Sequence, residues 1–387
     1  IRTLKVSDRV NLIEGSKSVE MAQIIIEMRS RGEKVISFNV GEPDFATSPI
    51  IVEETKRALD QGKTRYSAVP GENNIREKII SKVNSDHGLS LSYKNVALSN
   101  GSKQVLYSLF QLICNPGDEV IVPKPYWVSF PEAIKLSGAT PVFVSPLENN
   151  RISIENIKKS ISSKTKAIII NSPNNPTGLI ESEDVIKEIT ELAKKHNFMI
   201  ISDEAYEAII FDKKENNSAA RFDQELKNTM IVQSFSKSLC MTGFRLGYFV
   251  GHEDIVQPFI KLQSHICGNP PPFVQAGALA GLEQEEKLTS HMREVFEKRR
   301  DLAFSLCQEI FPNTEKPDGA FYLFPRLGKE ILDKYKSDIK LSMHILEKGK
   351  VALLPGSYFG MPDHLRICFA ASDEDIKAGF KAIKDIL

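Results

Sequence analysis

The chain has 387 residues, of which 41% are hydrophobic and 26% are charged, a composition close to that of average soluble globular proteins. Its 50 Lys and Arg residues balance 50 Asp and Glu residues, which argues against a nucleic-acid binder or a polybasic membrane-surface protein. No apolar run approaches the ~20 residues of a membrane-spanning helix. Five scattered cysteines without CxxC spacing indicate reduced thiols, not disulfides or a zinc site. We therefore expect a cytoplasmic enzyme or binding protein without a bound metal.

The first sixty residues predict one helix and one short strand. The helix covers residues 16–30, with apolar positions at Ile24, Ile25 and Met28, and Gly32 can end it. Residues 35–40 predict a strand that runs into the Gly- and Pro-containing loop GEPDF.

From about residue 95, short apolar runs alternate with helical segments. This alternation is typical of a mainly parallel α/β sheet covered by helices on both faces. The expected strands are 96–98, 120–122, 141–144, 167–170, 199–202, 230–233 and 246–250, and the expected helices are 103–114, 127–136 and 184–196.

After about residue 280 the pattern changes to that of a smaller α+β domain. It consists of a long charged helix at 282–310, strands at 321–324, 351–354 and 365–369, and a final helix from Asp373. We expect the N-terminal segment to pack with this part. The predicted division is a large domain of residues 46–285 and a small domain of residues 1–45 and 286–387.

Polar residues follow the ends of the predicted strands of the large domain, where ligands bind in open α/β sheets. They are Asn100 to Ser102, Asn174 and Asn175, Asp203 and Tyr206, and Ser234 to Lys237. Any one of these could be an ordinary loop residue or helix cap. Together they offer different chemical groups to one ligand, so we interpret them as a site.

Lys237 lies just past an apolar strand, where partial burial favours a neutral amine that can form a Schiff base with an aldehyde. Ser234 and Arg245 could hold a phosphate group, the arginine through its planar fork. The alternative is a surface lysine and an arginine in a salt bridge.

Asp203 ends the apolar run MIIS, so its carboxylate needs a cationic or donating partner. A protonated pyridine nitrogen would serve, and Tyr206 and Asn175 could donate to a phenolic oxygen of the same ring. The alternative for this motif is a helix start with acidic residues near the helix dipole.

Three further positions stand out by their residue type. The glycine-containing junction 100–104 can offer backbone N–H groups to an anion. Trp127, the only tryptophan, can stack on a flat ligand or pack in the core. Arg366 interrupts the apolar strand LRICF, where it either meets a ligand carboxylate, pairs with an internal Asp or Glu, or faces outward from the strand.

These motifs resemble the class I aminotransferases of pyridoxal-phosphate fold type I, and most of all their bacterial-type aspartate aminotransferase branch. The resemblance extends in order over nearly the whole chain. The motifs that carry it are VGEPDF (40–45), YSAVPGENNIRE (66–77), NGSKQ (100–104), GDEVIVPKPYWVSFPE (117–132), SPNNPTG (172–178), SDEAYE (202–207), SFSKSLCMTGFRLGY (234–248), GAFYLFP (319–325) and VALLPGSYFG (351–360).

The resemblance implies a seven-stranded type of sheet, pyridoxal 5'-phosphate as cofactor, and a homodimer with shared active sites. It also implies a role for each matching residue. At the cofactor ring, Lys237 is the Schiff-base lysine and proton shuttle, Asp203 contacts the pyridine nitrogen, Tyr206 and Asn175 contact the phenolic oxygen, and Trp127 stacks on the ring.

The resemblance also implies which residues bind the phosphate and the substrate. The phosphate is held by Ser234, Arg245 and the amides of Ser102, Lys103 and Gln104, and Tyr66 reaches the phosphate of the neighbouring subunit's cofactor. The substrate α-carboxylate is bound by Arg366, helped by Gly41 and Asn175.

Substrate preference is the least determined feature. In this branch the lysine at the position of Lys103 is associated with the distal carboxylate of aspartate or glutamate, but a flexible point charge also admits aromatic or prephenate-type substrates. The run Cys267-Gly268 replaces hydroxyl residues common in the family. The alternatives are a lyase or synthase on the same fold, and a non-enzymatic regulator.

Overall fold

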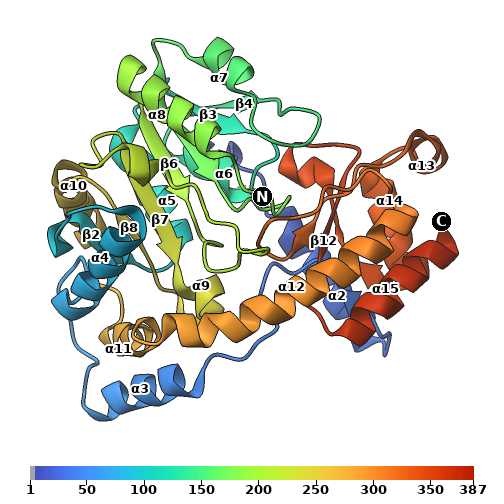
Figure 1. Cartoon of the computed structure of the whole chain (residues 1–387), viewed down its shortest axis with the longest axis horizontal. Coiled ribbons are helices and arrows are strands. Elements are labelled where there is room, and N and C mark those ends of the chain that lie inside the picture. Colours follow the sequence, from blue (N-terminus) through green and yellow to red (C-terminus); the bar gives the residue numbers. More distant parts are fainter. Residues whose placement is uncertain (1–4) are drawn as a thin grey trace.

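A seven-stranded sheet forms the centre of the larger part of the molecule, and the computed structural model describes residues 5–387 (Figure 1). Its order is β2-β8-β7-β6-β5-β3-β4, and all neighbours pair in parallel except β8, which is antiparallel to both β2 and β7. The strands are β2 (Val96–Ser99), β3 (Glu119–Pro123), β4 (Thr140–Val144), β5 (Thr165–Asn171), β6 (Met199–Asp203), β7 (Thr229–Ser234) and β8 (Gly247–Val250).

The middle residues of the strands are mostly apolar, as expected for a sheet whose two faces are both covered by helices. In β5, Ile169 packs on one face with α5, α6 and α10, whereas Ile168 and Ile170 pack on the other face with α7 and α8. The same second face is covered beside β2 and β8 by α3, α4 and α11. The helices of this part are α3 (Pro49–Asp60), α4 (Asn73–His87), α5 (Ser102–Ile113), α6 (Ser129–Leu136), α7 (Ile154–Ser160), α8 (Glu183–His196), α9 (Phe235–Ser238), α10 (Glu253–Ser264) and α11 (Pro272–Leu282).

The C-terminal part contains two small sheets. β1 pairs in parallel with β10, and β12 lies between β11 and β9 in an antiparallel sheet. The 26-residue helix α12 runs from the large sheet to this part and packs there against α15 (Figure 1). The elements are β1 (Ile36–Ser37), β9 (Tyr322–Leu323), β10 (Val351–Ala352), β11 (Leu354–Pro355), β12 (Leu365–Cys368), α12 (Glu285–Ile310), α13 (Lys329–Tyr335), α14 (Asp338–His344) and α15 (Asp373–Ile386).

The N-terminal segment packs against this C-terminal part. It contains α1 (Asp8–Asn11) and α2 (Lys17–Ser30), and Met21, Ile25 and Met28 of α2 share a buried cluster with Leu346 and Leu354. The mainly parallel seven-stranded sheet is therefore confirmed. The exact domain boundaries, 45/46 and 285/286, stay a prediction.

Three predicted elements differ from the structure. The long helix expected from residue 282 begins at Glu285, because Leu282 ends α11 and Gln284 leaves the helical conformation with φ −126° and ψ 20°. The single strand expected at 351–354 is two strands, since Val351–Ala352 pairs with β1 and Leu354–Pro355 pairs with β12. The helix expected from residue 127 begins at Ser129. Within residues 5–387 no helix is both long and apolar enough to cross a membrane.

Candidate active site

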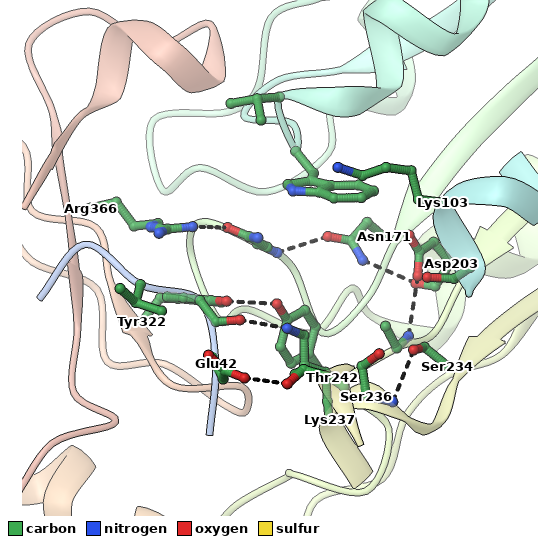
Figure 2. Close-up of a pocket in the computed structure, with 18 of the residues that line it drawn as sticks. Glu42, Lys103, Asn171, Asp203, Ser234, Ser236, Lys237, Thr242, Tyr322 and Arg366 are labelled. Carbon is green, nitrogen blue, oxygen red and sulfur yellow. Dashed lines mark hydrogen bonds between the residues drawn. The ribbon is translucent and has the colours of Figure 1, made fainter. Parts of the chain in front are cut away.

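A cavity of about 460 Å³ lies at the carboxyl ends of β5, β6 and β7, between the large sheet and the three-stranded sheet. Figure 2 shows Asp203 and Ser234 on one side of this cavity, Tyr322 and Arg366 on the other, and Lys237 between them. Eleven of the predicted site residues line it: Gly41, Ser102, Lys103, Trp127, Asn175, Asp203, Tyr206, Ser234, Lys237, Arg245 and Arg366. Gln104 and Tyr66 do not.

Neighbouring strand ends bring the first group of side chains together. Asn171 of β5 is in register with Asp203 of β6. The Asn171 side-chain amide donates to the Asp203 carbonyl (3.1 Å), and its Oδ1 accepts the Asn175 N–H (2.8 Å). Asn171 was not among the predicted site residues, although its place directly before SPNNPTG was a signal. These two hydrogen bonds connect the loop that contains Asn174 and Asn175 to the end of β6.

Asp203 has a carboxylate in a nearly water-free position, because only 4% of the residue is exposed. Its Oδ1 accepts the Ala205 N–H at 3.2 Å. Burial raises the pKa of Asp203 to about 7, against the opposing effects of the Ala205 hydrogen bond and the Lys237 charge. A carboxylate held in this way favours a cationic donor in the cavity.

Lys237 lies on the one-turn helix α9, whose N-cap Ser234 accepts the Ser236 N–H at 3.0 Å. Its Nζ donates to the Gly41 carbonyl at 2.5 Å, across 196 residues of sequence. Burial lowers the pKa of Lys237 to about 8, and the charges of Arg366 and Arg245 act in the same direction. A substantial fraction of the amine is therefore neutral and nucleophilic near neutral pH.

Arg366 is buried to 4% exposure on β12. It donates from Nη1 to Asn175 Oδ1 (3.0 Å) and from Nη2 to the Asn39 carbonyl (2.6 Å). Its Nε is buried without a hydrogen-bond partner, and among residues 5–387 no Asp or Glu pairs with the guanidinium. The alternative of an internal acidic partner is therefore wrong, and the cation is left for a ligand anion.

Tyr206 and Tyr322 meet at the floor of the cavity, where their hydroxyl oxygens are 2.6 Å apart. The Tyr322 ring also lies under the Arg366 guanidinium, 4.6 Å from Cζ to the ring centroid. Burial raises the pKa of Tyr206, so this phenol is a donor at neutral pH. The sequence analysis did not assign Tyr322 a role, although GAFYLFP was among its motifs.

The N-terminus of α5 points to the end of the cavity near Arg245 and Ser234. Gly247 of β8 permits this approach, because a Cβ there would lie 2.5 Å from the Ser102 nitrogen. Arg245 donates to the Thr242 carbonyl at 3.0 Å and contacts Gly101 closely. The Gln104 N–H already donates to the Gly101 carbonyl (3.1 Å), which leaves the amides of the two preceding residues for an anion.

Lys103 and Trp127 form a pair at the wall of the cavity, with Lys103 Nζ 5.2 Å from the centroid of the indole ring. This is within the range of a cation–π interaction. Partial burial and the charge of Arg245 lower the pKa of Lys103, although the residue remains exposed to solvent. The ammonium is thus held at the cavity and open to an incoming anion.

Tyr66 lies outside the cavity and is 98% exposed. It borders a shallow surface groove together with Cys267, Asn269 and Phe273. The single chain gives this aromatic side chain nothing to contact, and its predicted role depends on a second subunit.

Comparisons with known proteins agree with this geometry. The family model described as aminotransferase class I and II matches residues 33–383. A probable aspartate/prephenate aminotransferase of Aquifex aeolicus is 39% identical, and an aspartate aminotransferase of Bacillus subtilis is 37% identical, each over 98% of both chains. The solved structure of a Thermus thermophilus aspartate aminotransferase with maleate has a TM-score of 0.94 and 32% identity over 100% of both chains.

Proposed function

The chain belongs to the class I and II aminotransferases, and we propose that it transfers the amino group of an L-dicarboxylic amino acid, aspartate or glutamate, to a 2-oxo acid. One observation carries the proposal. The cavity combines the amine of Lys237, whose pKa is lowered, with two separate cations, the buried Arg366 and the accessible Lys103. The amine suits proton transfer and the two cations suit a substrate with two carboxylates.

The family generally depends on pyridoxal 5'-phosphate, and the donor set of the cavity fits this cofactor. When bound, it supplies an electron sink for the bonds at the substrate α-carbon. The residues that would hold it are Asp203 at the ring nitrogen, Tyr206 and Asn175 at the phenolic oxygen, Trp127 on the ring face, and Ser234, Arg245 and the amides of Ser102 and Lys103 at the phosphate.

Each side chain has a defined task in this proposal. Asp203 holds a proton on the pyridine nitrogen, because a buried carboxylate is stabilised by a cationic partner. Lys237 removes the α-proton of the substrate and returns a proton at the cofactor carbon. Arg366 holds the α-carboxylate, and its unpartnered Nε supplies a further donor for this anion.

We further propose a homodimer in which Tyr66 reaches the site of the partner chain. The exposure of Tyr66, its place beside Cys267, and the resemblance of its motif support this arrangement. Cytoplasmic location remains a prediction that rests on the five free thiols.

A steady-state comparison of substrates tests the dicarboxylate preference. We expect Lys103→Met to lower kcat/KM for L-aspartate by roughly 10- to 100-fold, the equivalent of one charged hydrogen bond, with little change for L-alanine. The control is Lys94→Met, an exposed lysine outside the cavity. Equal losses for aspartate and alanine, or a wild-type preference for aromatic substrates, would contradict the proposal and favour the broader, prephenate-type reading.

A further inference from the structure

A second group of ionisable side chains lies behind Asp203, outside the cavity. It consists of His87, the last residue of α4, and Glu204 and Glu207, which follow β6. One ligand atom from each of the three lies within 4.8 Å of the other two. Neither glutamate lines the cavity, so the proposed reaction does not use this group.

Glu204 is 1% exposed, and only one of its two carboxylate oxygens has hydrogen-bond partners. Its Oε1 accepts hydrogen bonds from the Ser202 hydroxyl (2.7 Å) and the Ser218 hydroxyl (2.6 Å). Its Oε2 is buried without a partner, and the same is true of His87 Nδ1. Two buried polar atoms without a hydrogen-bond partner are costly, and a bound cation would give both of them a partner.

The charges around this group are unbalanced. Lys82 is the cation of the cluster, and its Nζ is 2.8 Å from Glu207, 2.8 Å from Asp86 and 3.8 Å from Glu285. With Glu204 this makes four carboxylates around one ammonium group. The nearby Arg221 is paired with Glu215 at 3.4 Å and contributes little to the balance. Uncompensated negative charge in a buried cluster is costly and favours a bound cation.

We propose that His87, Glu204 and Glu207 form a binding site for one divalent transition-metal ion such as Zn²⁺. Imidazole nitrogen and carboxylate oxygen are usual ligands of this ion, at about 2.0 to 2.2 Å. Ligand atoms at such distances lie roughly 3 to 4 Å apart, so the half-buried His87 and Glu207 close slightly around the ion. A surface groove lined by Lys82, Asp86 and Glu285 lies beside the site, since Lys82 Nζ is 2.8 Å from Glu207.

The ion has a structural role in this arrangement. Glu204 follows Asp203 directly, and Glu207 follows Tyr206, so the metal fixes the turn that carries two residues of the candidate active site. It connects this turn to the C-terminal end of α4, beside β2 and β8 (Figure 1). Metal binding to the folded chain therefore raises its thermal stability and leaves the chemical groups of the cavity unchanged.

Zinc titration of the purified full-length holoprotein, after treatment with a chelator, tests the site. We expect one Zn²⁺ per chain for wild type and at least tenfold weaker binding for His87→Gln, because one ligand is lost. The matched control is His196→Gln, since His196 also ends a helix but is exposed. Thermal unfolding should shift upward with Zn²⁺ in wild type and the control, and not in His87→Gln.

Equal zinc binding by wild type and His87→Gln, or no binding by wild type, would overturn the proposal. Anomalous X-ray scattering at the zinc edge from wild-type crystals locates the ion without any variant. A peak between His87 and Glu204 supports the site, and a peak only at cysteines or surface groups contradicts it.

Discussion

The wall of the cavity that carries Asp203 and Ser234 belongs to the interior of the seven-stranded sheet, whereas Tyr322 and Arg366 stand on strands of two and four residues. β6 and β7 have a hydrogen-bonded neighbour on both sides. The opposite wall is joined to the large part by side-chain contacts such as Arg366 to Asn175 and by backbone hydrogen bonds such as Ala320 to Ile209. Because its strands are short and pair only within a small sheet, we expect this wall to be the more adjustable of the two. Substitutions on the two walls should therefore have different kinetic signatures.

The largest effect should come from Lys237→Ala. Removal of the amine takes away the group that moves the proton, so we expect kcat to fall by at least about 10³-fold in a steady-state assay while the cofactor stays bound non-covalently. Lys227→Ala, at an exposed lysine just before β7, is the control and should keep normal activity. Retained turnover in Lys237→Ala would remove this lysine from the mechanism.

A pH titration of Lys237 examines the same wall without substrate. Burial disfavours the charged ammonium, so the folded, cofactor-free protein should react with a small aldehyde with a midpoint at about pH 8. At pH 7 this gives a neutral fraction roughly 200-fold above that of an ordinary lysine. Borohydride trapping and mass spectrometry measure the labelling. In the unfolded chain the midpoint should return to about 10.4, and a midpoint near that value in the folded protein would contradict the assigned burial.

Arg366→Lys tests the substrate wall. The charge remains but the planar fork is lost, so we expect KM for the amino acid to rise roughly 10- to 100-fold with a smaller change in kcat. Arg326→Lys, at an exposed arginine of the same region, should leave both constants unchanged. A fall in kcat alone, with KM unchanged, would mean that Arg366 acts on the chemical step. Catalysis and substrate binding would then not be separated between the two walls.

Tyr322→Phe should give the smallest effect. The substitution leaves the buried Tyr206 hydroxyl without its 2.6 Å partner, which costs about 1 to 3 kcal/mol of unfolding free energy in urea titrations. The matched control is Tyr107→Phe, at a half-buried tyrosine of α5. If Tyr322→Phe were as stable as wild type, the tyrosine pair would not be part of what holds the second wall in place.

The two walls also differ in how far they could be predicted from the sequence. Asp203 and Ser234 each lie two residues past a short apolar run, and this local pattern was sufficient to place them at one edge of a parallel sheet. The role of Asn171 was missed because it acts through hydrogen bonds with Asn175 and β6, which the local sequence pattern does not show.

Residues of the second wall depend on contacts that no local pattern encodes. Arg366 was recognisable as a cation within an apolar strand, but its partner Asn39 is 327 residues away. Residues 351–354 read as one strand, although the two halves pair with elements from opposite ends of the chain. The role predicted for Tyr66 lies at the site of a second subunit and came only from the resemblance of its motif, because no contact among residues 5–387 points to it.

The most direct test of the dicarboxylate aminotransferase account is the visible absorption spectrum of the purified protein before and after addition of L-aspartate alone. The account predicts a yellow protein whose long-wavelength band is replaced by the shorter-wavelength band of the aminated cofactor, because half of the transfer proceeds without a second substrate. An unchanged spectrum with aspartate and glutamate, together with a change on adding an aromatic amino acid, would contradict the proposed substrate class.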